Sequence, residues 1–223
     1  MGKITAVLFD FDGVVADTEG LYAVFWGNIA ERYRLNIPDF TLQVKGMTMG
    51  AIFEKFFPGY PEAEKRRIIE ECMDYEYRME FREVPGATGF IQWMKDRDYR
   101  VGLVTSSPDS KLEFALERLH LSDVFDTIVS ADRIVRGKPD PMCYRLAAAD
   151  LKVSPDECVV FEDSFFGIEA GKRAGMRVIG LSTTNPAEKI AETSAAPLTP
   201  LPDSSDIFSL FIPPIATTGI LTE

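Results

Sequence analysis

The sequence predicts an α/β protein: a parallel sheet with helices on both faces, and an all-helical unit inserted after the first strand. Two observations lead to this fold class. Short runs of β-branched and apolar residues alternate with helical patterns along most of the chain, and this order is typical of parallel sheets. Between the first and second of these runs, however, residues 16–83 contain helical patterns and no convincing strand.

The predicted strands are apolar over most of their length, as expected for strands that are buried on both faces. They lie at residues 4–9, 100–106, 125–130, 158–163 and 176–183. Helices are predicted before the last four strands, at 87–99, 110–121, 142–151 and 167–175. In sheets of this kind, ligands bind at the carboxyl ends of the strands.

The insert is expected to form a small cap domain (16–83) over these strand ends, while 1–15 and 84–223 form the sheet domain. Its helical patterns lie at 21–33, 49–57 and 62–81. Aromatic residues recur in them at helical spacing and are expected to form the cap core. They are Phe25, Trp26, Phe53, Phe56 and Phe57. The segment after Ala195 is rich in Pro, Ser and Thr, and its end is expected to be peripheral.

Composition excludes several classes of function. The 223 residues carry a formal net charge of −11, whereas proteins that bind duplex nucleic acid are usually basic on at least one face. No stretch approaches the ~20 apolar residues of a membrane helix, and the N-terminus lacks the pattern of a signal peptide. We therefore expect a cytoplasmic monomer that binds neither nucleic acid nor membranes.

The histidine and cysteine content narrows the chemistry further. The single histidine, His120, lies at the end of a helical pattern, so a multi-histidine metal site is excluded and a Ser-His-Asp triad is disfavoured. The three cysteines are far apart and odd in number. They are expected to be reduced thiols rather than disulfide partners or zinc ligands. Catalysis is thus expected to use carboxylates, hydroxyls and lysine.

The first predicted strand ends in two acids, Asp10 and Asp12, followed by Gly13. Residues two apart on a strand start out on the same face, and glycine lets the backbone turn sharply. Both carboxylates are therefore expected at the carboxyl end of the strand, near the expected ligand site. An Asp-Gly turn without further function is the alternative. A calcium loop does not fit, because Val14 and Val15 stand where it needs an oxygen ligand and a glycine.

Other polar residues come at the ends of later strands. Thr105 and Ser106 end the second strand, Lys138 lies in the loop after the third, and Glu162 and Asp163 end the fourth. Each has an ordinary structural explanation, such as a helix cap, a solvated lysine or an acidic turn. Together they lie at the edge of the sheet where this architecture binds ligands, which favours a functional site.

The charges of these residues indicate the ligand. The acids Asp10, Asp12, Glu162 and Asp163 face a single lysine, Lys138. Two like charges ~4 Å apart repel by roughly 4 kcal/mol at an effective dielectric constant of ~20. Either some acids are protonated or a cation binds among them. Oxygen ligands suit Mg²⁺, which commonly bridges to phosphate, and a carboxylate beside both can attack phosphorus.

The motifs DFDGVVADTE, LVTSS, GKPDP and VVFEDS occur in this order. With them the chain resembles the haloacid dehalogenase-like superfamily of phosphohydrolases, within it the β-phosphoglucomutase-like and sugar-phosphatase branch. The resemblance covers essentially all of the sheet domain, and the insert position matches the helical-cap subgroup. It implies a Rossmann-like core, bound Mg²⁺ and an aspartyl-phosphate intermediate.

The resemblance also implies catalytic roles. Asp10 would be the nucleophile, and Asp12 the general acid that protonates the leaving oxygen and then activates water. Thr105, with the Ser106 amide, would hold the phosphoryl group, and Lys138 would balance its charge. Dehalogenase members lack the second aspartate of the first motif, so the presence of Asp12 favours phosphoryl transfer.

For the metal, the resemblance implies that Asp10, Asp163 and the main-chain carbonyl of Asp12 hold Mg²⁺, with Glu162 supporting the site. A receiver-like switch, phosphorylated on aspartate, would share the acids, the hydroxyl and the lysine. In that class the lysine comes last, whereas Lys138 precedes Glu162 and Asp163 here. A cap would also serve no purpose in such a switch.

The insert bears on the substrate. Lys45 and Gly46 match a Lys-Gly cap loop of the mutase-like branch, and Lys45 and Tyr22 are candidate substrate contacts. True mutases carry an Arg after this loop and a His at the position of Tyr22, whereas this chain has Met49 after the loop. The Arg clamps a second phosphate, so its loss favours a phosphatase of sugar or polyol phosphates. A β-phosphoglucomutase-type mutase is the alternative.

Overall fold

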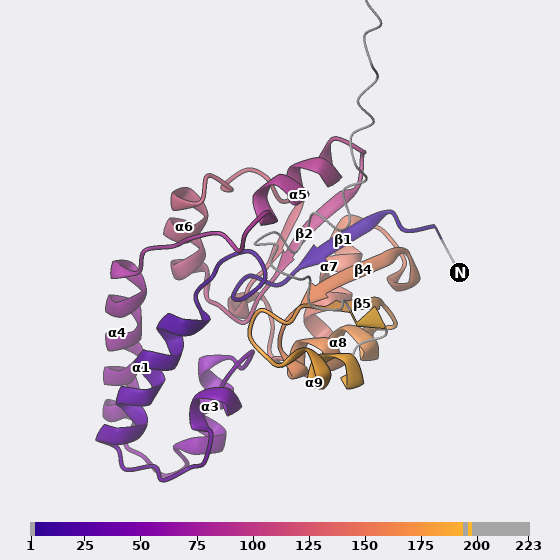
Figure 1. Ribbon diagram of the computed structural model, residues 1–223. Helices are drawn as coiled ribbons and strands as arrows, with labels where there is room; N and C mark the ends of the chain where they lie inside the picture. Colours follow the sequence, from indigo (N-terminus) through magenta and orange to yellow (C-terminus); the bar gives the residue numbers. More distant parts are fainter. Residues whose placement is uncertain (1–2, 194–195, 198–223) are drawn as a thin grey trace, which may run out of the picture.

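The computed structural model of the chain describes residues 3–193 and 196–197. A six-stranded parallel sheet lies at its centre, in the order β3-β2-β1-β4-β5-β6 (Figure 1). The strands are β1 (Ala6–Phe9), β2 (Arg100–Val104), β3 (Thr127–Val129), β4 (Cys158–Glu162), β5 (Arg177–Gly180) and β6 (Ala196–Pro197). The predicted fold class is confirmed, and the five predicted strands are all present.

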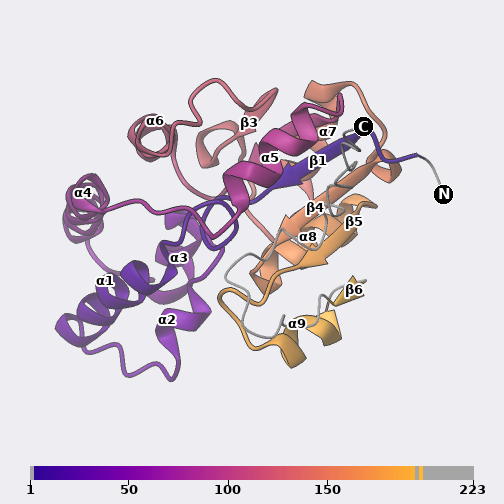
Figure 2. The ribbon, with the colours of Figure 1, turned by 45° about the horizontal axis from the view of Figure 1, so that its top comes forward.

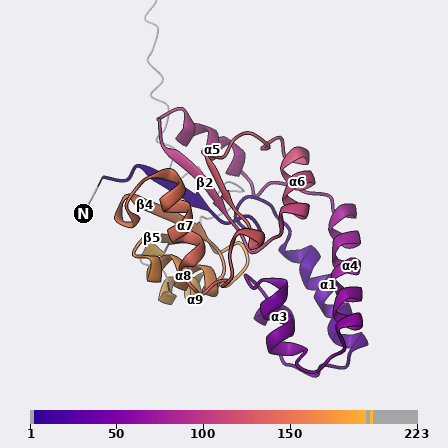
Figure 3. The same ribbon diagram turned by 180° about the vertical axis from the view of Figure 1, so that it is seen from behind.

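Helices cover both faces of the sheet (Figures 2 and 3). One face packs against α5 (Ala87–Lys95) and α6 (Asp109–Arg118). The other packs against α7 (Met142–Leu151), α8 (Phe165–Ala174) and α9 (Ala187–Thr193). Two short 3₁₀ helices, η1 (Ala131–Arg133) and η2 (Pro155–Glu157), lie in the connections. Strand β6 and helix α9 were not predicted, because a two-residue strand and a seven-residue helix carry little periodicity.

The central strand β1 shows why the sheet needs cover on both sides. Its side chains alternate between the faces, so Val7 and Phe9 join the apolar cluster under α5 and α6, while Ala6 and Leu8 join the cluster under α7 and α8. All four are fully buried. An apolar residue at every position is what a strand buried on both faces requires.

The insert forms four helices between β1 and α5: α1 (Glu19–Arg32), α2 (Phe40–Gln43), α3 (Met49–Phe56) and α4 (Glu62–Arg78). They lie beside the sheet and have an apolar cluster of their own (Figure 1). This cluster contains all five aromatic residues that were expected to form the core of the insert. The helix α2 was not predicted, since four residues are too few to show a period.

The chain passes between sheet and insert twice, and the two passages lie side by side. Ala16 forms an isolated antiparallel bridge with Glu83, and the Val84 amide donates a 2.9 Å hydrogen bond to the Val15 carbonyl. The insert is therefore joined to the sheet through one paired ribbon of backbone.

Cys72, Cys143 and Cys158 are free and buried. In the described part of the chain, no helix is both long and apolar enough to cross a membrane. Apart from residues 196–197, the segment after Ala195 lies outside the described residues, and so does the expectation made for it.

Candidate active site

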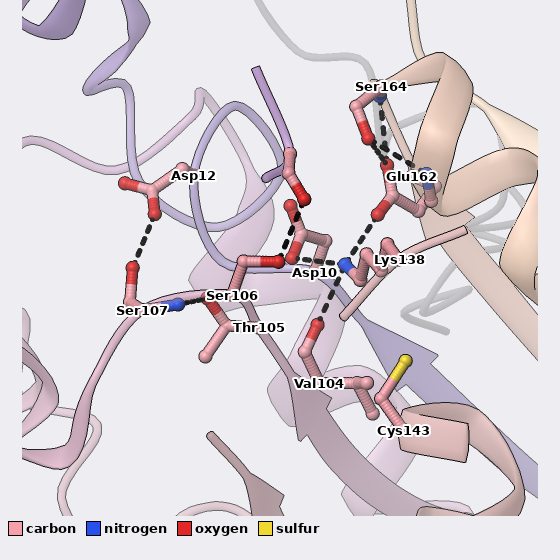
Figure 4. A network of polar contacts seen from close by, with 12 residues as sticks. Asp10, Asp12, Val104, Thr105, Ser106, Ser107, Lys138, Cys143, Glu162 and Ser164 are labelled. Carbon is pink, nitrogen blue, oxygen red and sulfur yellow. Dashed lines mark hydrogen bonds and ion pairs between the residues drawn. The ribbon is translucent and has the colours of Figure 1, made fainter. Parts of the chain in front are cut away.

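The predicted core residues meet at the carboxyl edge of the sheet, and Figure 4 shows Asp10, Lys138 and Glu162 there. Asp10 follows β1, Thr105 follows β2, Lys138 comes from the connection after β3, and Glu162 and Asp163 lie at the end of β4. Each is at most 5% exposed. These five residues therefore gather at the edge where the rule for parallel sheets places ligand-binding residues.

Lys138 joins two of the acids. Its Nζ lies 2.8 Å from Asp10 Oδ1 and 2.6 Å from Glu162 Oε1, and it also donates to the Val104 carbonyl at 3.2 Å (Figure 4). Burial alone would lower the pKa of Lys138, but the carboxylates of Asp10 and Glu162 outweigh it and hold this pKa well above its usual value. Lys138 is therefore held as a cation between the two acids.

Glu162 is fixed by further donors. Its Oε2 accepts from the Ser164 amide at 2.8 Å and from the Ser164 hydroxyl at 2.9 Å, and Tyr144 donates to Oε1 at 3.2 Å. A Cβ at Gly167 would lie 1.6 Å from Oε1, so only glycine leaves room for the carboxylate. Glu162 thus has the environment of a residue that positions Lys138.

The acidic residues fit a divalent cation. Asp10, Glu162 and Asp163 each offer one carboxylate oxygen, and these oxygens lie within 4.8 Å of one another. Burial raises the pKa of Asp10 to about 7, although Lys138 opposes the shift. Burial, together with the neighbouring Glu162 and Asp10, raises the pKa of Asp163 well above its usual value. A buried cluster of oxygen donors with a deficit of positive charge suits Mg²⁺.

The turn after β1 packs tightly against Asp163. Gly13 has a φ of +78°, and a Cβ there would lie 2.1 Å from Asp163 Oδ2. The same oxygen accepts a hydrogen bond from the Thr184 hydroxyl, and Asn185 Nδ2 donates to the Asp163 carbonyl at 2.9 Å. The glycine of the first motif is therefore needed both for its backbone conformation and for this close approach.

Asp10 and Asp12 both line the cavity at the end of β1, but their side chains bond to different partners. Strand β1 ends at Phe9, and the chain then enters a tight turn, so the alternation of side chains along a strand no longer applies. Asp10 turns toward Lys138, whereas Asp12 turns toward Ser107, which donates to its Oδ2 at 2.8 Å (Figure 4). Both acids remain at the strand end, but with different partners.

The main partner of Asp12 was missed by the sequence analysis. Lys111, in α6, places its Nζ 2.6 Å from Asp12 Oδ1 and 2.7 Å from Oδ2. The Thr18 hydroxyl also donates to Oδ1. The available signal was position: Lys111 lies four residues before the buried Ala115 and beside the buried Leu112, on the apolar face of its helix. A lysine there requires a buried partner.

A cavity lies between the site and the insert. From the sheet side it is lined by Asp10, Asp12, Thr105, Ser106 and Asp163. From the insert it is lined by residues that include Glu19, Tyr22, Trp26, Lys45, Met49 and Glu76. The two candidate substrate contacts, Tyr22 and Lys45, therefore both reach the cavity wall.

Both candidates also have protein partners. Lys45 Nζ forms an ion pair with Glu19 Oε2 at 3.1 Å, and it lies 3.4 Å from the Thr184 carbonyl. The Tyr22 hydroxyl donates to Glu76 Oε1 at 2.5 Å. Burial raises the pKa of Glu19 and that of Glu76. The insert thus presents polar groups to the cavity, and its one lysine there is already paired with an acid.

The loop around Gly46 brings the insert into contact with the sheet. The Ser106 hydroxyl donates to the Gly46 carbonyl at 2.8 Å. Gly46 has a φ of +72°, and a Cβ there would lie 2.6 Å from Ser164 Oγ. Ser106 was expected to bind phosphate through its amide, and the structure adds this contact of its side chain with the insert.

A parallel α/β sheet with buried acids and a lysine at its carboxyl edge, facing a helical insert, is the framework of an enzyme. Residues 7–181 match the haloacid dehalogenase-like hydrolase family, and the chain belongs to this family. The resemblance inferred from the four motifs is therefore confirmed.

Similar proteins that are named as phosphatases or phosphoglucomutases support this assignment to the family. The chain is 32% identical over 209 residues to a phosphorylated carbohydrates phosphatase of Thermotoga maritima, covering 86% of this chain and 93% of the relative. It is 33% identical over 196 residues to β-phosphoglucomutase of Bacillus subtilis, covering 81% and 84%. The crystal structure of β-phosphoglucomutase from Clostridium difficile is 26% identical and superimposes with a TM-score of 0.71, covering 86% of this chain and 88% of that chain.

Proposed function

We propose that the protein is a Mg²⁺-dependent phosphatase of small phosphorylated metabolites and acts through an aspartyl-phosphate on Asp10. The observation that carries the proposal is the setting of Asp10. It lines the cavity, bonds to Lys138 at 2.8 Å, and belongs to a cluster of three buried acids. A carboxylate in such a place can attack phosphorus while the lysine offsets the charge of the phosphoryl oxygens.

The remaining residues then have complementary roles. Thr105 and Ser106 hold the phosphoryl group, and Asp12 gives a proton to the leaving oxygen and later takes one from water. Bound Mg²⁺ would offset the negative charge of the phosphate and of the acids. Its proposed ligands are Asp10, Asp163 and the Asp12 carbonyl, and Glu162, which bonds to Lys138 and Ser164, supports them.

The proposed substrates are sugar or polyol monophosphates. The insert offers the acids Glu19 and Glu76 and the donors Lys45 and Tyr22, which suit hydroxyl groups, and Trp26 supplies an apolar wall. Because Lys45 is already paired with Glu19, it is poorly suited to grip a second phosphate. The phosphorylated carbohydrates phosphatase among the relatives supports the same substrate class.

A phosphosugar mutase is the second candidate, because the identity to β-phosphoglucomutase is as high as that to the phosphatase. A mutase must hold a bisphosphate intermediate in two orientations and exclude water. Met49, which lines the cavity, offers no charge for a second phosphate. This favours hydrolysis.

We further propose that residues 16–83 act as a cap domain that opens and closes about 16–18 and 81–84. The paired backbone at Ala16 and Glu83 supports hinges at these two passages. The cap would exclude water and complete the site around a bound substrate. We propose that the enzyme is cytoplasmic, and the buried free thiols support this location. We also propose that it acts as a monomer.

The test is release of phosphate from a panel of small phosphate esters, with and without Mg²⁺. The panel includes pyrophosphate and both anomers of glucose 1-phosphate, and Asp10→Asn is the control variant. Formation of glucose 6-phosphate from the β-anomer is followed in parallel with a bisphosphate primer. We expect metal-dependent phosphate release and no isomer. Isomer without net phosphate loss would establish the mutase instead, and near-normal turnover by Asp10→Asn would refute the aspartyl-phosphate mechanism.

A further inference from the structure

Lys111 is a buried cation of the cavity region to which the proposed function gives no role. Its side chain is completely buried, and its three hydrogen bonds go to the two oxygens of Asp12 and to the Ser107 hydroxyl at 2.9 Å. An ammonium group has three donors, so all of them are used within one small group of residues. Nothing in the packing of α6 requires a lysine at this position rather than an apolar residue.

The surroundings of Lys111 strengthen its contact with Asp12. The Phe11 ring centroid lies 5.1 Å from Nζ and the Tyr22 ring centroid 4.7 Å, so aromatic faces flank the ammonium. Such walls exclude water, and hydrogen bonds between charged groups are stronger where water is excluded. Tyr22 belongs to α1, so the insert supplies part of this enclosure.

Asp12 itself is not sealed in. Its side chain is 18% exposed and lines the cavity, while Lys111 holds it from behind. Ser107 and Thr18 add one hydrogen bond each to the same carboxylate. The carboxyl group is therefore held in one place at the cavity wall by three residues, of which only Lys111 carries a charge.

We infer that Lys111 is the positioning residue for the proton-transferring group Asp12. The inference rests on the proposed phosphatase function. As a carboxylate oxygen of Asp10 forms its bond to phosphorus, the bond between phosphorus and the leaving oxygen breaks. The electron pair of the broken bond stays on the leaving oxygen, which takes the proton from Asp12. Asp12 is then a carboxylate, and the ammonium of Lys111 stabilises it. When water attacks the aspartyl-phosphate, its proton passes to Asp12 and restores the acid.

If Lys111 has this role, the loss of kcat/KM on replacing it should depend on the leaving group of the substrate. A sugar alcohol is a poor leaving group and needs a proton, whereas p-nitrophenolate leaves without one. The ratio kcat/KM covers the steps up to departure of the leaving group and omits the later hydrolysis. We therefore expect Lys111→Met to lower kcat/KM by about 10²-fold for the best sugar phosphate of the panel, the lower end of typical acid-base effects. For p-nitrophenyl phosphate we expect a loss below about threefold.

The experiment measures both substrates with Lys111→Met, Asp12→Asn, the double variant and Lys111→Arg. Lys95→Met is the matched control, because Lys95 pairs with Asp126 away from the cavity. In the Asp12→Asn background, Lys111→Met should have little further effect, since the group that it positions is gone. Lys111→Arg keeps the positive charge, so it should restore much of the wild-type ratio between kcat/KM for the sugar phosphate and kcat/KM for p-nitrophenyl phosphate. Lys111→Gln replaces the Met variant if the latter does not fold.

Equal losses on both substrates would show that Lys111 serves the fold alone and would overturn the inference. The inference would also be overturned if the loss of kcat/KM in the double variant equalled the product of the two single losses. Lys111 would then act independently of Asp12. If the wild-type protein released phosphate from no ester at all, the proposed function would fail. That result differs from either outcome for Lys111.

Discussion

Lys138 bonds to Asp10 at 2.8 Å across 128 residues of sequence, and this contact joins the loop after β3 to the end of the central strand. The same ammonium group reaches Glu162 on the neighbouring strand β4. The stability of this edge of the sheet and the proposed chemistry of Asp10 therefore both depend on the ammonium group of Lys138. The buried acids at this edge would repel one another without it, and the nucleophile would lose the partner that orients it.

Lys138→Met should therefore destabilise the protein. Among the described residues, Lys138 is the one cation paired with Asp10 or Glu162. Removing one partner of a buried ion pair typically costs about 3–5 kcal/mol. Urea unfolding of the metal-free protein measures this. Lys95→Met, which breaks a partly exposed pair with Asp126, should cost at most about 1 kcal/mol. Equal costs for the two variants would contradict the prediction.

The stability of the metal-free protein should fall as pH rises from about 5 to about 7. The pKa of Asp10 is about 7 in the folded protein against a usual 3.8. Between these values the folded state holds a proton that the unfolded state has lost, so stability decreases by up to about 1.4 kcal/mol per pH unit for this group. Asp163, Glu19 and Glu76 also have raised pKa values and act in the same direction.

Mg²⁺ should reverse this loss, because it binds the deprotonated acids. Thermal unfolding at several pH values, with and without Mg²⁺, measures both effects. The rise in Tm on adding Mg²⁺ is expected to be larger at pH 8 than at pH 5. A rise that is independent of pH would show that the cation does not bind at these acids.

Asp163→Asn should abolish most of the stabilisation by Mg²⁺ and reduce turnover by at least about 10²-fold. It removes one carboxylate of the three-acid cluster. Asp12→Asn is the matched control, because the Asp12 side chain bonds to Lys111 and Ser107 and lies outside that cluster. The control should lose turnover and keep the Mg²⁺-dependent rise in Tm. If both variants kept that rise, the proposed ligand set would be wrong.

Gly46→Ala should lower kcat/KM by about tenfold or more by keeping the insert from closing on the sheet. A Cβ would lie 2.6 Å from Ser164 Oγ, and the φ of +72° costs a residue other than glycine about 1 kcal/mol. Gly50→Ala is the control, since a Cβ at Gly50 in α3 meets nothing within 4 Å. Steady-state kinetics should separate the two variants clearly, and equal activity would mean that this contact does not govern closure.

Much of the fold could be predicted because its signals are local. The five main strands are continuous apolar runs, and the helical patterns between them require a parallel sheet. The aromatic core of the insert follows from helical spacing in the same way. Short elements such as α2 and β6 could not be predicted, since four and two residues carry no period.

By itself the sequence determined which polar residues follow the strands, and therefore the edge of the sheet at which they gather. Parallel strands that end in Asp10, Thr105 and Glu162 must bring those residues to one edge. Only the tertiary structure decided which group each side chain contacts. Lys111 meets Asp12 across 99 residues, and Ser106 meets Gly46 across 60. Such contacts depend on how helices and turns pack after the strands have ended, where no periodicity along the chain fixes the direction of a side chain.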